Sequence, residues 1–476
     1  MDHDTPITIA SAAAALRAGS LTSTELTTTM FDRIDAADGK LGAFVTLCRD
    51  AAMLAAAQAD ADFAAGVDRG PLHGIPLAVK DIIATADAPT TANSRVLAPD
   101  WGAGIDAPVV SRLRSAGAVI VGKTTTSEFA CGLPDPDKGF PIPRNPWNPE
   151  HSAGGSSSGT GVAVAAGFAL GGLGTDTGGS VRFPAAMNGH TGLKVTFGRV
   201  PKNDVVPLGY TLDSIGPMAR SAEDCALLLQ VMAGADPGDP TSAAVDVPDY
   251  SAALAGGIAG LRVGVPMPYF FDADGLDDEA RTAVLAAIDV IRGAGAVVTS
   301  TVVEHAQLAK EANGVTMAVE AFAYHRNDLA ARWSDYGCHT RMTLGRGALF
   351  TAGDYAQAQR FRAAFRRHLA ALFSEFDVLV TPAWPTPARR IDAMNAEDHV
   401  VGPSFSSPWN LSGLPAAAVP CGFSSSGLPL SMQIVGRPFA ESTVLRVAHA
   451  YQLLTDWHVQ VPPFATQLRR PAAAQR

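Results

Sequence analysis

Two hydrophobic periodicities alternate along this chain. Stretches with apolar residues three and four apart predict helices, and these dominate residues 1–66. There Thr22 and Glu25 have the spacing of a capping box, and Gly39 stands where a helix end is expected. Residues 277–293 form a further amphipathic pattern that predicts a helix.

A long helix is also predicted over residues 354–376. Phe361, Phe365, Leu369 and Leu372 share one face of it, and arginines occupy the other. We interpret the arginine face as an ordinary solvated surface, with a binding surface as the alternative.

Short runs of β-branched and aliphatic residues predict strands between the helices. They occur at residues 71–83, 118–121, 261–266, 296–303, 377–383 and 428–436. Because helices and apolar strands alternate and no period repeats, the chain is predicted to be a layered α/β protein, not a solenoid or propeller. Residues 234–260, rich in Asp, Pro, Gly and Ala, are expected to be a surface connection.

The most unusual stretch runs from Gly154 to Lys194 and contains two glycine-serine clusters, GGSSSG and TDTGGS, joined by an apolar segment of about one helix. Glycine loses more backbone entropy on folding than any other residue, so such density indicates that bare backbone is needed there. Backbone N–H groups can hold either a phosphate or an oxyanion. Neither cluster carries the lysine of a phosphate loop, whereas both carry serines, which favours a nucleophile with an oxyanion hole.

This run resembles the signature of the amidase signature family of serine hydrolases, and the resemblance extends more loosely from Ile7 to Tyr451. It implies a serine nucleophile, a second serine on a cis peptide bond and a lysine, with no catalytic histidine. It also implies one α/β domain over residues 1–476, built on a mixed, mostly parallel sheet with helices on both sides. Within it we expect a helical cover (1–66), a signature core (67–233), the connection at 234–260 and a C-terminal part (261–476).

The resemblance assigns three catalytic roles. Ser180 matches the nucleophile, Ser156 the serine that relays its proton, and Lys80 the base. Without the resemblance, Lys80 in its apolar strand is interpreted as a snorkelling side chain or an ion-pair partner of Asp81. As a base it must be neutral near neutral pH, so activity is expected to rise with pH. Ser157 is the alternative to Ser156.

Other site residues follow from the same match. The oxyanion hole would be formed by the backbone N–H groups of Thr177, Gly178, Gly179 and Ser180. Around the site we expect Ser157, Asp176 and Arg182, with Asp176 and Arg182 paired to tie the loop down. Residues expected to contact the substrate are Cys131, Gly132 and Tyr210.

Two other motifs compete with this interpretation. Gly117–Thr124, GAVIVGKT, fits the phosphate-loop pattern with Lys123 and would indicate a nucleotide-binding phosphotransferase, but AVIV is strand-like and should not curl around a phosphate. GSSSG at Gly155–Gly159 fits the nucleophile elbow of α/β-hydrolases, but a proline-rich loop precedes it where a strand is required. An elbow would need one of the downstream histidines: His190, His305, His325, His339, His368, His399 or His449.

Composition and charge narrow the possible partners. With 476 residues, 47% of them hydrophobic, the chain can bury a large core, and its net charge of −10 argues against nucleic acid or an anionic membrane as a partner. The five cysteines form no CxxC pair, so neither a zinc site nor a disulfide framework is expected. We expect no cofactor and no metal, a cytoplasmic location, and a monomer or homodimer.

These features predict a hydrolase that cleaves the C–N bond of a carboxylic amide, and also carbamates (urethanes) or esters, through a serine acyl-enzyme. The preferred hypothesis is a freestanding amidase, because the segment VPKNDVVPLGYTL at 200–212 departs from the amidotransferase pattern. The alternative is an A-type amidotransferase subunit that hydrolyses glutamine and delivers ammonia to a partner.

Overall fold

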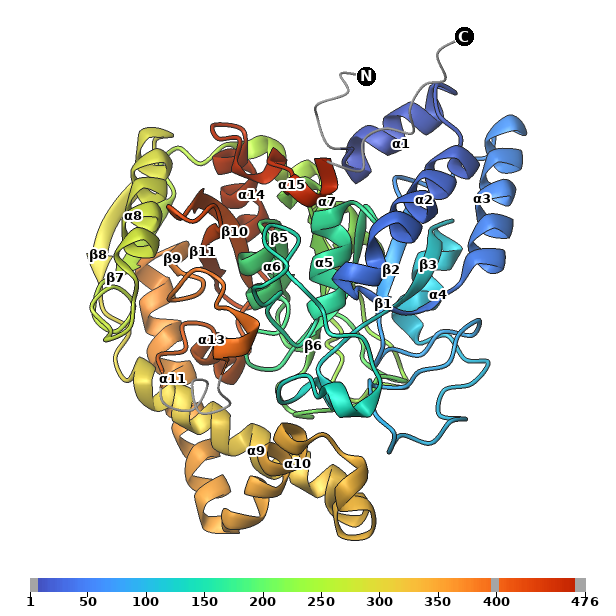
Figure 1. The fold of residues 1–476 in the computed structure, drawn as a ribbon. Coiled ribbons are helices and arrows are strands. Elements are labelled where there is room, and N and C mark those ends of the chain that lie inside the picture. Colours follow the sequence, from blue (N-terminus) through green and yellow to red (C-terminus); the bar gives the residue numbers. More distant parts are fainter. Residues whose placement is uncertain (1–6, 395–401, 467–476) are drawn as a thin grey trace.

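The computed structural model describes residues 7–394 and 402–466. Within them eleven strands form one sheet in the order β1-β3-β2-β4-β6-β5-β10-β11-β9-β7-β8 (Figure 1). The strands are β1 Phe44–Leu47, β2 Pro76–Lys80, β3 Val119–Thr124, β4 Gly171–Asp176, β5 Thr191–Lys194, β6 Ser214–Ala219, β7 Arg262–Pro266, β8 Val297–Thr301, β9 Val378–Pro382, β10 Ala416–Phe423 and β11 Pro429–Gly436. The predicted α/β class is therefore confirmed.

The sheet is mixed, as expected, but it is not mostly parallel. Of the ten pairings among the described strands, six are antiparallel and four parallel. Five of the antiparallel pairs are consecutive in the middle of the sheet, from β4 to β9, and the sixth, β1 with β3, lies at one edge. In the middle, β10 and β11 are joined by a turn too short for a parallel crossover.

Helices cover both faces of the sheet. Adjacent residues of β4 point to opposite faces: a Cβ on Gly171 would contact Ile9 of α1 and Leu228 of α7, whereas one on Gly172 would contact Thr160 of α5. The helices are α1 Ile9–Arg17, α2 Ser23–Leu41, α3 Arg49–Ala64, α4 Pro108–Ser115, α5 Ser158–Ala166, α6 Arg182–Asn188, α7 Ala222–Met232, α8 Asp278–Gly293, α9 Ala306–Arg332, α10 Cys338–Gly345, α11 Ala352–Glu375, α13 Ser407–Ser412, α14 Glu441–Gln452 and α15 Pro463–Thr466.

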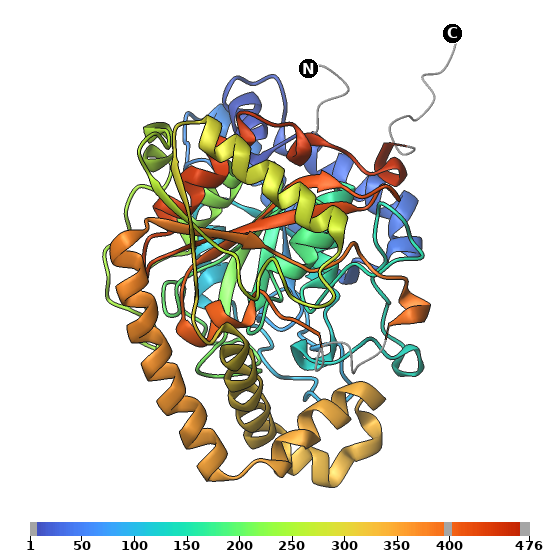
Figure 2. The same cartoon turned by 90° about the vertical axis from the view of Figure 1, so that its left-hand side faces the viewer.

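Short 3₁₀ turns complete the chain: η1 Glu128–Ala130, η2 Pro136–Lys138, η3 Ala252–Gly256, η4 Trp333–Asp335, η5 Arg346–Leu349, η6 Ile391–Ala393 and η7 Trp457–Val459. Helices α9, α10 and α11 project beyond the sheet as a helical arm (Figures 1 and 2). In the described part of the chain, no helix combines the length and apolarity that crossing a bilayer requires.

Local signals located several helix ends. The capping box of Thr22 and Glu25 is confirmed at the start of α2, and α8 begins after Asp277 as predicted. The predicted end of α2 at Gly39 is wrong, because the helix continues to Leu41. It is Gly42, with φ +66°, that adopts the left-handed conformation which terminates it.

Candidate active site

Lys80 is the last residue of β2, a central strand whose residues are all buried. Its Nζ donates hydrogen bonds to Ser156 Oγ and to Thr175 Oγ1, both at 2.8 Å. Asp81 instead pairs with Lys123, at 3.2 Å. The two explanations of Lys80 without the resemblance, snorkelling and pairing with Asp81, are therefore wrong.

The environment of Lys80 changes its acidity. Burial lowers the pKa of the Lys80 ammonium to about 7, although the carboxylates of Asp213 and Asp176 oppose the shift. A large share of this side chain is therefore a neutral amine at neutral pH, and a neutral amine can accept a proton from Ser156 Oγ.

The serines of the first glycine cluster have different surroundings. The Gly155–Ser156 peptide bond is cis, and the Ser156 carbonyl accepts hydrogen bonds from Thr126 Oγ1 and Ser127 N. Ser157 Oγ instead accepts from Thr175 N and donates to Thr175 O, so it anchors β4. Of these two hydroxyls, only that of Ser156 contacts Lys80 Nζ.

The second glycine cluster forms the turn between β4 and α6. Ser180 is partly exposed there, and its carbonyl accepts a hydrogen bond from Ser157 N at 3.2 Å, which joins the two clusters. The backbone N–H groups of Thr177, Gly178, Gly179 and Ser180 have no acceptor within residues 7–394 and 402–466. Four neighbouring free donors are what an oxyanion requires.

The two glycines of this turn have different steric surroundings. Gly179 has φ +138°, and a Cβ on it would lie 2.3 Å from the Phe183 ring and 2.6 Å from Ser406 Oγ. A Cβ on Gly178 would come no closer than 3.7 Å to another atom, Nδ2 of Asn313. The turn therefore requires glycine at position 179 and has room for a methyl group at position 178.

We expect Gly179→Ala to lower kcat by a factor on the order of 100 or more, because the added methyl group must displace the turn that presents the N–H donors. Gly178→Ala is the matched control, and its loss of kcat should be much smaller. Steady-state kinetics on both variants, with circular dichroism to verify folding, measures the difference. Equal losses in the two variants would contradict this account of the turn.

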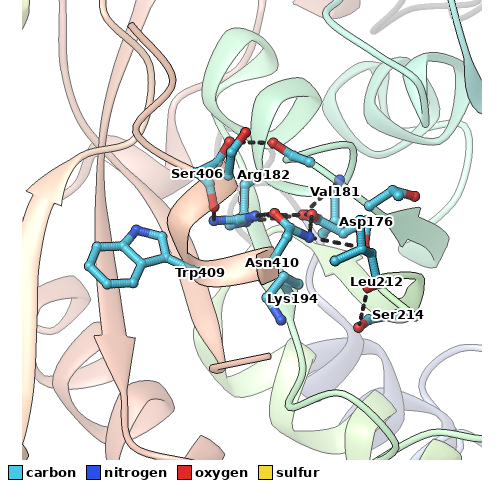
Figure 3. A network of polar contacts seen from close by, with 12 residues as sticks. Asp176, Val181, Arg182, Lys194, Leu212, Ser214, Ser406, Trp409 and Asn410 are labelled. Carbon is cyan, nitrogen blue, oxygen red and sulfur yellow. Dashed lines mark hydrogen bonds and ion pairs between the residues drawn. The ribbon is translucent and has the colours of Figure 1, made fainter. Parts of the chain in front are cut away.

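A buried ion pair fixes the base of the turn, as expected for Asp176 and Arg182. Arg182 donates from Nε and Nη2 to the Asp176 carboxylate, both at 3.0 Å, and its other donors reach Asn410 Oδ1, Gln433 Oε1 and Ser406 O (Figure 3). Burial alone would raise the pKa of Asp176, but the Arg182 guanidinium and the hydrogen bonds lower it to about 2. The carboxylate is thus a fixed negative charge.

We expect Arg182→Leu to lower the free energy of unfolding by about 3–5 kcal/mol, because it leaves the Asp176 charge buried without its partner. The exposed pair of Arg390 with Asp392 provides the control, and Arg390→Leu should cost far less, since solvent screens that pair. Urea denaturation of both variants measures the two losses. A loss for Arg182→Leu no larger than that of the control would refute this role.

A cavity of about 230 Å³ lies beside the turn and is lined by Thr175, Thr177, Lys202, Tyr210 and Asp213, among others. Tyr210 is 49% exposed, and the Lys202 ammonium lies over its ring at 4.7 Å. Tyr210 therefore occupies a position suited to substrate contact.

The other two residues expected at the substrate, Cys131 and Gly132, directly follow Ala130, which lines this cavity. Cys131 is buried, and its carbonyl accepts a hydrogen bond from Thr340 Oγ1 of α10; a Cβ on Gly132 would also contact Thr340. Neither residue lines the cavity beside the turn. Burial raises the pKa of the Cys131 thiol to about 12, so this residue is not a thiolate nucleophile.

Several residues around the turn carry no signal in the sequence. Asn313, 2% exposed on α9, places Nδ2 3.5 Å from the Thr177 carbonyl, and its buried Oδ1 has no hydrogen-bond partner among the described residues. Ser406 Oγ donates to the Gly178 carbonyl. Both side chains contact backbone carbonyls of the turn although they are more than 130 residues away in sequence, so no local motif could reveal them.

Neither rival motif has the structure it requires. Residues Val119–Thr124 are strand β3, and Lys123 is buried, where it donates to Thr90 Oγ1 at 2.6 Å and pairs with Asp81. A phosphate loop is therefore not formed. No histidine of the described residues hydrogen-bonds to Ser156, Ser157 or Ser180; His190 Nδ1 lies against the Thr191 carbonyl, and His399 is outside the described residues.

The sheet, the glycine turn and the buried lysine define an amidase-type enzyme of the α/β class. Comparison with known families agrees: the family model described as Amidase matches residues 25–445, and the chain belongs to this family.

Known proteins similar to this chain include amidotransferase subunits as well as amidases. The A-type subunit of glutamyl-tRNA(Gln) amidotransferase from Chloroflexus aurantiacus is 41% identical, over 96% of this chain and 98% of its own length. A solved structure of a vestigial protein complex that reveals the origins of an s-triazine catabolic enzyme has a chain with TM-score 0.88 and 32% identity, over 96% of this chain and all of that one. The structure of the native peptide amidase of Stenotrophomonas maltophilia has a TM-score of 0.82 and 32% identity, and the alignment covers 96% of this chain and 98% of that one.

Proposed function

We propose that this chain is an A-type amidotransferase subunit, which hydrolyses the side-chain amide of glutamine and passes the ammonia to a partner chain. Its amide-hydrolysing chemistry rests on one observation, the 2.8 Å contact between Lys80 Nζ and Ser156 Oγ beside the Ser180 turn. The choice of an A-type subunit is supported by the 41% identity, over nearly the full length of both chains, to such a subunit.

In the proposed reaction Ser180 Oγ attacks the carboxamide carbon. Its proton passes to Ser156 Oγ while the Ser156 proton passes to Lys80 Nζ. The N–H groups of Thr177 to Ser180 stabilise the oxyanion. When the intermediate collapses, the C–N bond breaks and the proton returns through Ser156 to the leaving group, which departs as ammonia. Water then attacks the acyl-enzyme by the same route and releases the acid.

Charges of both signs line the cavity beside the turn, since Lys202 and Asp239 both contribute to it. Asp213 adds a second carboxyl group. A free amino acid carries an ammonium and a carboxylate, and a site with groups of both signs can orient it. This cavity supports glutamine as the substrate more than it supports an uncharged aryl amide.

The second candidate is the freestanding amidase preferred in the sequence analysis, acting on aryl amides or carbamates. Its specific support is the 32% identity to a peptide amidase whose fold aligns over 96% of this chain. The higher identity to amidotransferase subunits favours the subunit over this candidate.

Ammonia release by the purified chain tests the choice, with glutamine, an aryl amide and an aryl carbamate, each with and without the other amidotransferase subunits. Glutamine turnover that the added subunits stimulate is the expected result. Rapid turnover of aryl amides or carbamates by the chain alone, with glutamine inert throughout, would establish the freestanding amidase. Ser180→Ala provides the blank for both reactions.

A further inference from the structure

The outer face of α11 differs in charge from the rest of the molecule. Helix α11, Ala352–Glu375, contains four arginines, one aspartate and one glutamate, a net charge of +2 in a chain whose total is −10. One of the four, Arg362, is buried. Helix α11 runs along the outside of the arm, with α9 on its inner side (Figure 2). Its inward residues, among them Phe365 and Leu369, are buried, and its outward residues are open to solvent.

Two arginines define this outer face. Arg360 and Arg367 are seven residues apart, two helical turns or about 10 Å, and therefore project from the same side. Between them lies a shallow hollow lined by Gln357, Phe361, Ala363 and Ala364 as well as by the arginines themselves. Small side chains between two long ones leave room for another element to approach the helix closely.

Neither arginine forms an ion pair with a described residue. Arg360 Nη1 reaches only Gln357 Oε1, at 3.3 Å, and Arg367 has no polar partner within the described chain. Some exposed arginines elsewhere on this protein do pair with carboxylates, as Arg262 does with Asp377 and Arg390 with Asp392, whereas the exposed Arg326 and Arg437 form no ion pair with a described residue. The α11 pair thus presents two unneutralised, planar donors beside an apolar hollow, a composition enriched in protein interfaces.

We propose that the outer face of α11 docks an acidic amphipathic helix of a partner chain, with carboxylates two turns apart on Arg360 and Arg367 and a small apolar side chain in the hollow. A second copy of this chain does not fit, because a two-fold contact would set arginine against arginine. An extended nucleic acid does not fit either, since the acidic remainder of the chain repels it. The proposal goes beyond the proposed reaction and holds for either substrate class.

The test uses the full chain and a labelled, helix-stabilised peptide with glutamates seven residues apart, followed by fluorescence anisotropy. Binding should weaken at least tenfold when the glutamates become glutamine, and equally in Arg360→Glu/Arg367→Glu. The matched control, Arg326→Glu/Arg437→Glu, reverses two exposed arginines away from this face and should bind as the unmodified chain does. A peptide with lysines in place of the glutamates should bind Arg360→Glu/Arg367→Glu about as tightly as the glutamate peptide binds the unmodified chain.

Several outcomes would overturn the proposal: no peptide binding, equal weakening in both double variants, or stronger binding of a duplex RNA probe than of the peptide. Dimerisation in sedimentation experiments that Arg360→Glu/Arg367→Glu abolishes would assign the face to a second copy and also refute the proposal. Because neither arginine lies at the active site, the basal hydrolytic rate and thermal unfolding of the double variant should be unchanged, which separates lost docking from lost folding.

Discussion

Ser180→Ala is expected to abolish amide hydrolysis, with kcat lower by a factor on the order of 10⁴ or more. The proposed reaction has no other nucleophile: Ser157 Oγ is engaged with Thr175, and the Cys131 thiol is buried with a raised pKa. What remains in the variant would come from binding and from the free N–H donors of the turn. Single-turnover ammonia release measures the loss.

The control for this result is Ser157→Ala. It removes a hydrogen bond to β4 and should reduce stability by about 1 kcal/mol while retaining most of the turnover. If Ser180→Ala keeps appreciable activity, or if Ser157→Ala is the inactive variant, the assignment of the nucleophile fails.

Lys80→Met is expected to lower kcat by a factor on the order of 10³, because the proton of Ser156 then has no acceptor. In the unmodified chain kcat/KM should fall as the pH drops through about 7, where the Lys80 amine becomes protonated. That acidic limb should be missing from the residual activity of the variant. A limb that persists in Lys80→Met belongs to another group and would remove Lys80 from the role of base.

The same lysine predicts a change in stability with pH. Its pKa is lowered by burial to about 7 in the folded chain, so between pH 7 and 10.5 the unfolded chain binds more protons than the folded one. Stability from this group therefore rises with pH across that window. Comparing urea denaturation of the unmodified chain and Lys80→Met isolates the effect, since other groups contribute equally to both. The free energy of unfolding of the unmodified chain should increase relative to that of Lys80→Met as the pH increases. A difference between the two free energies that does not change with pH would contradict the lowered pKa of Lys80.

The sequence predicted those features of the fold that depend on residues close together along the chain. The capping box of Thr22 and Glu25 and the helix after Asp277 were predictable because a cap depends on residues three or four apart. The glycine clusters around Ser156 and Ser180 indicated a backbone-lined site, since only glycine adopts conformations such as that of Gly179 without strain. The resemblance to the amidase signature family added Lys80, from a segment far away in sequence, to the predicted site residues.

Five strands were not predicted. Strand β1 lies within residues 1–66, which were interpreted as helical. Strands β4, β5, β6 and β10 contain glycine, alanine or proline, which carry little strand preference, and they become strands through their central place in the sheet. For the same reason the sequence could not fix the balance of parallel and antiparallel pairs. Strand order is decided by which elements pack together across long separations, and no local pattern records it.

The sequence by itself thus determined the α/β class, the family and the glycine turn. Only the tertiary structure decided that Lys80 contacts Ser156, 76 residues away, and not its neighbour Asp81. The tertiary structure also decided that the Ser156 hydroxyl contacts Lys80 while the Ser157 hydroxyl contacts Thr175. It placed Asn313 and Ser406 against the turn. The physical reason is that a side chain at a strand end is paired by the strands and turns that the sheet places beside it, which residue order along the chain does not specify.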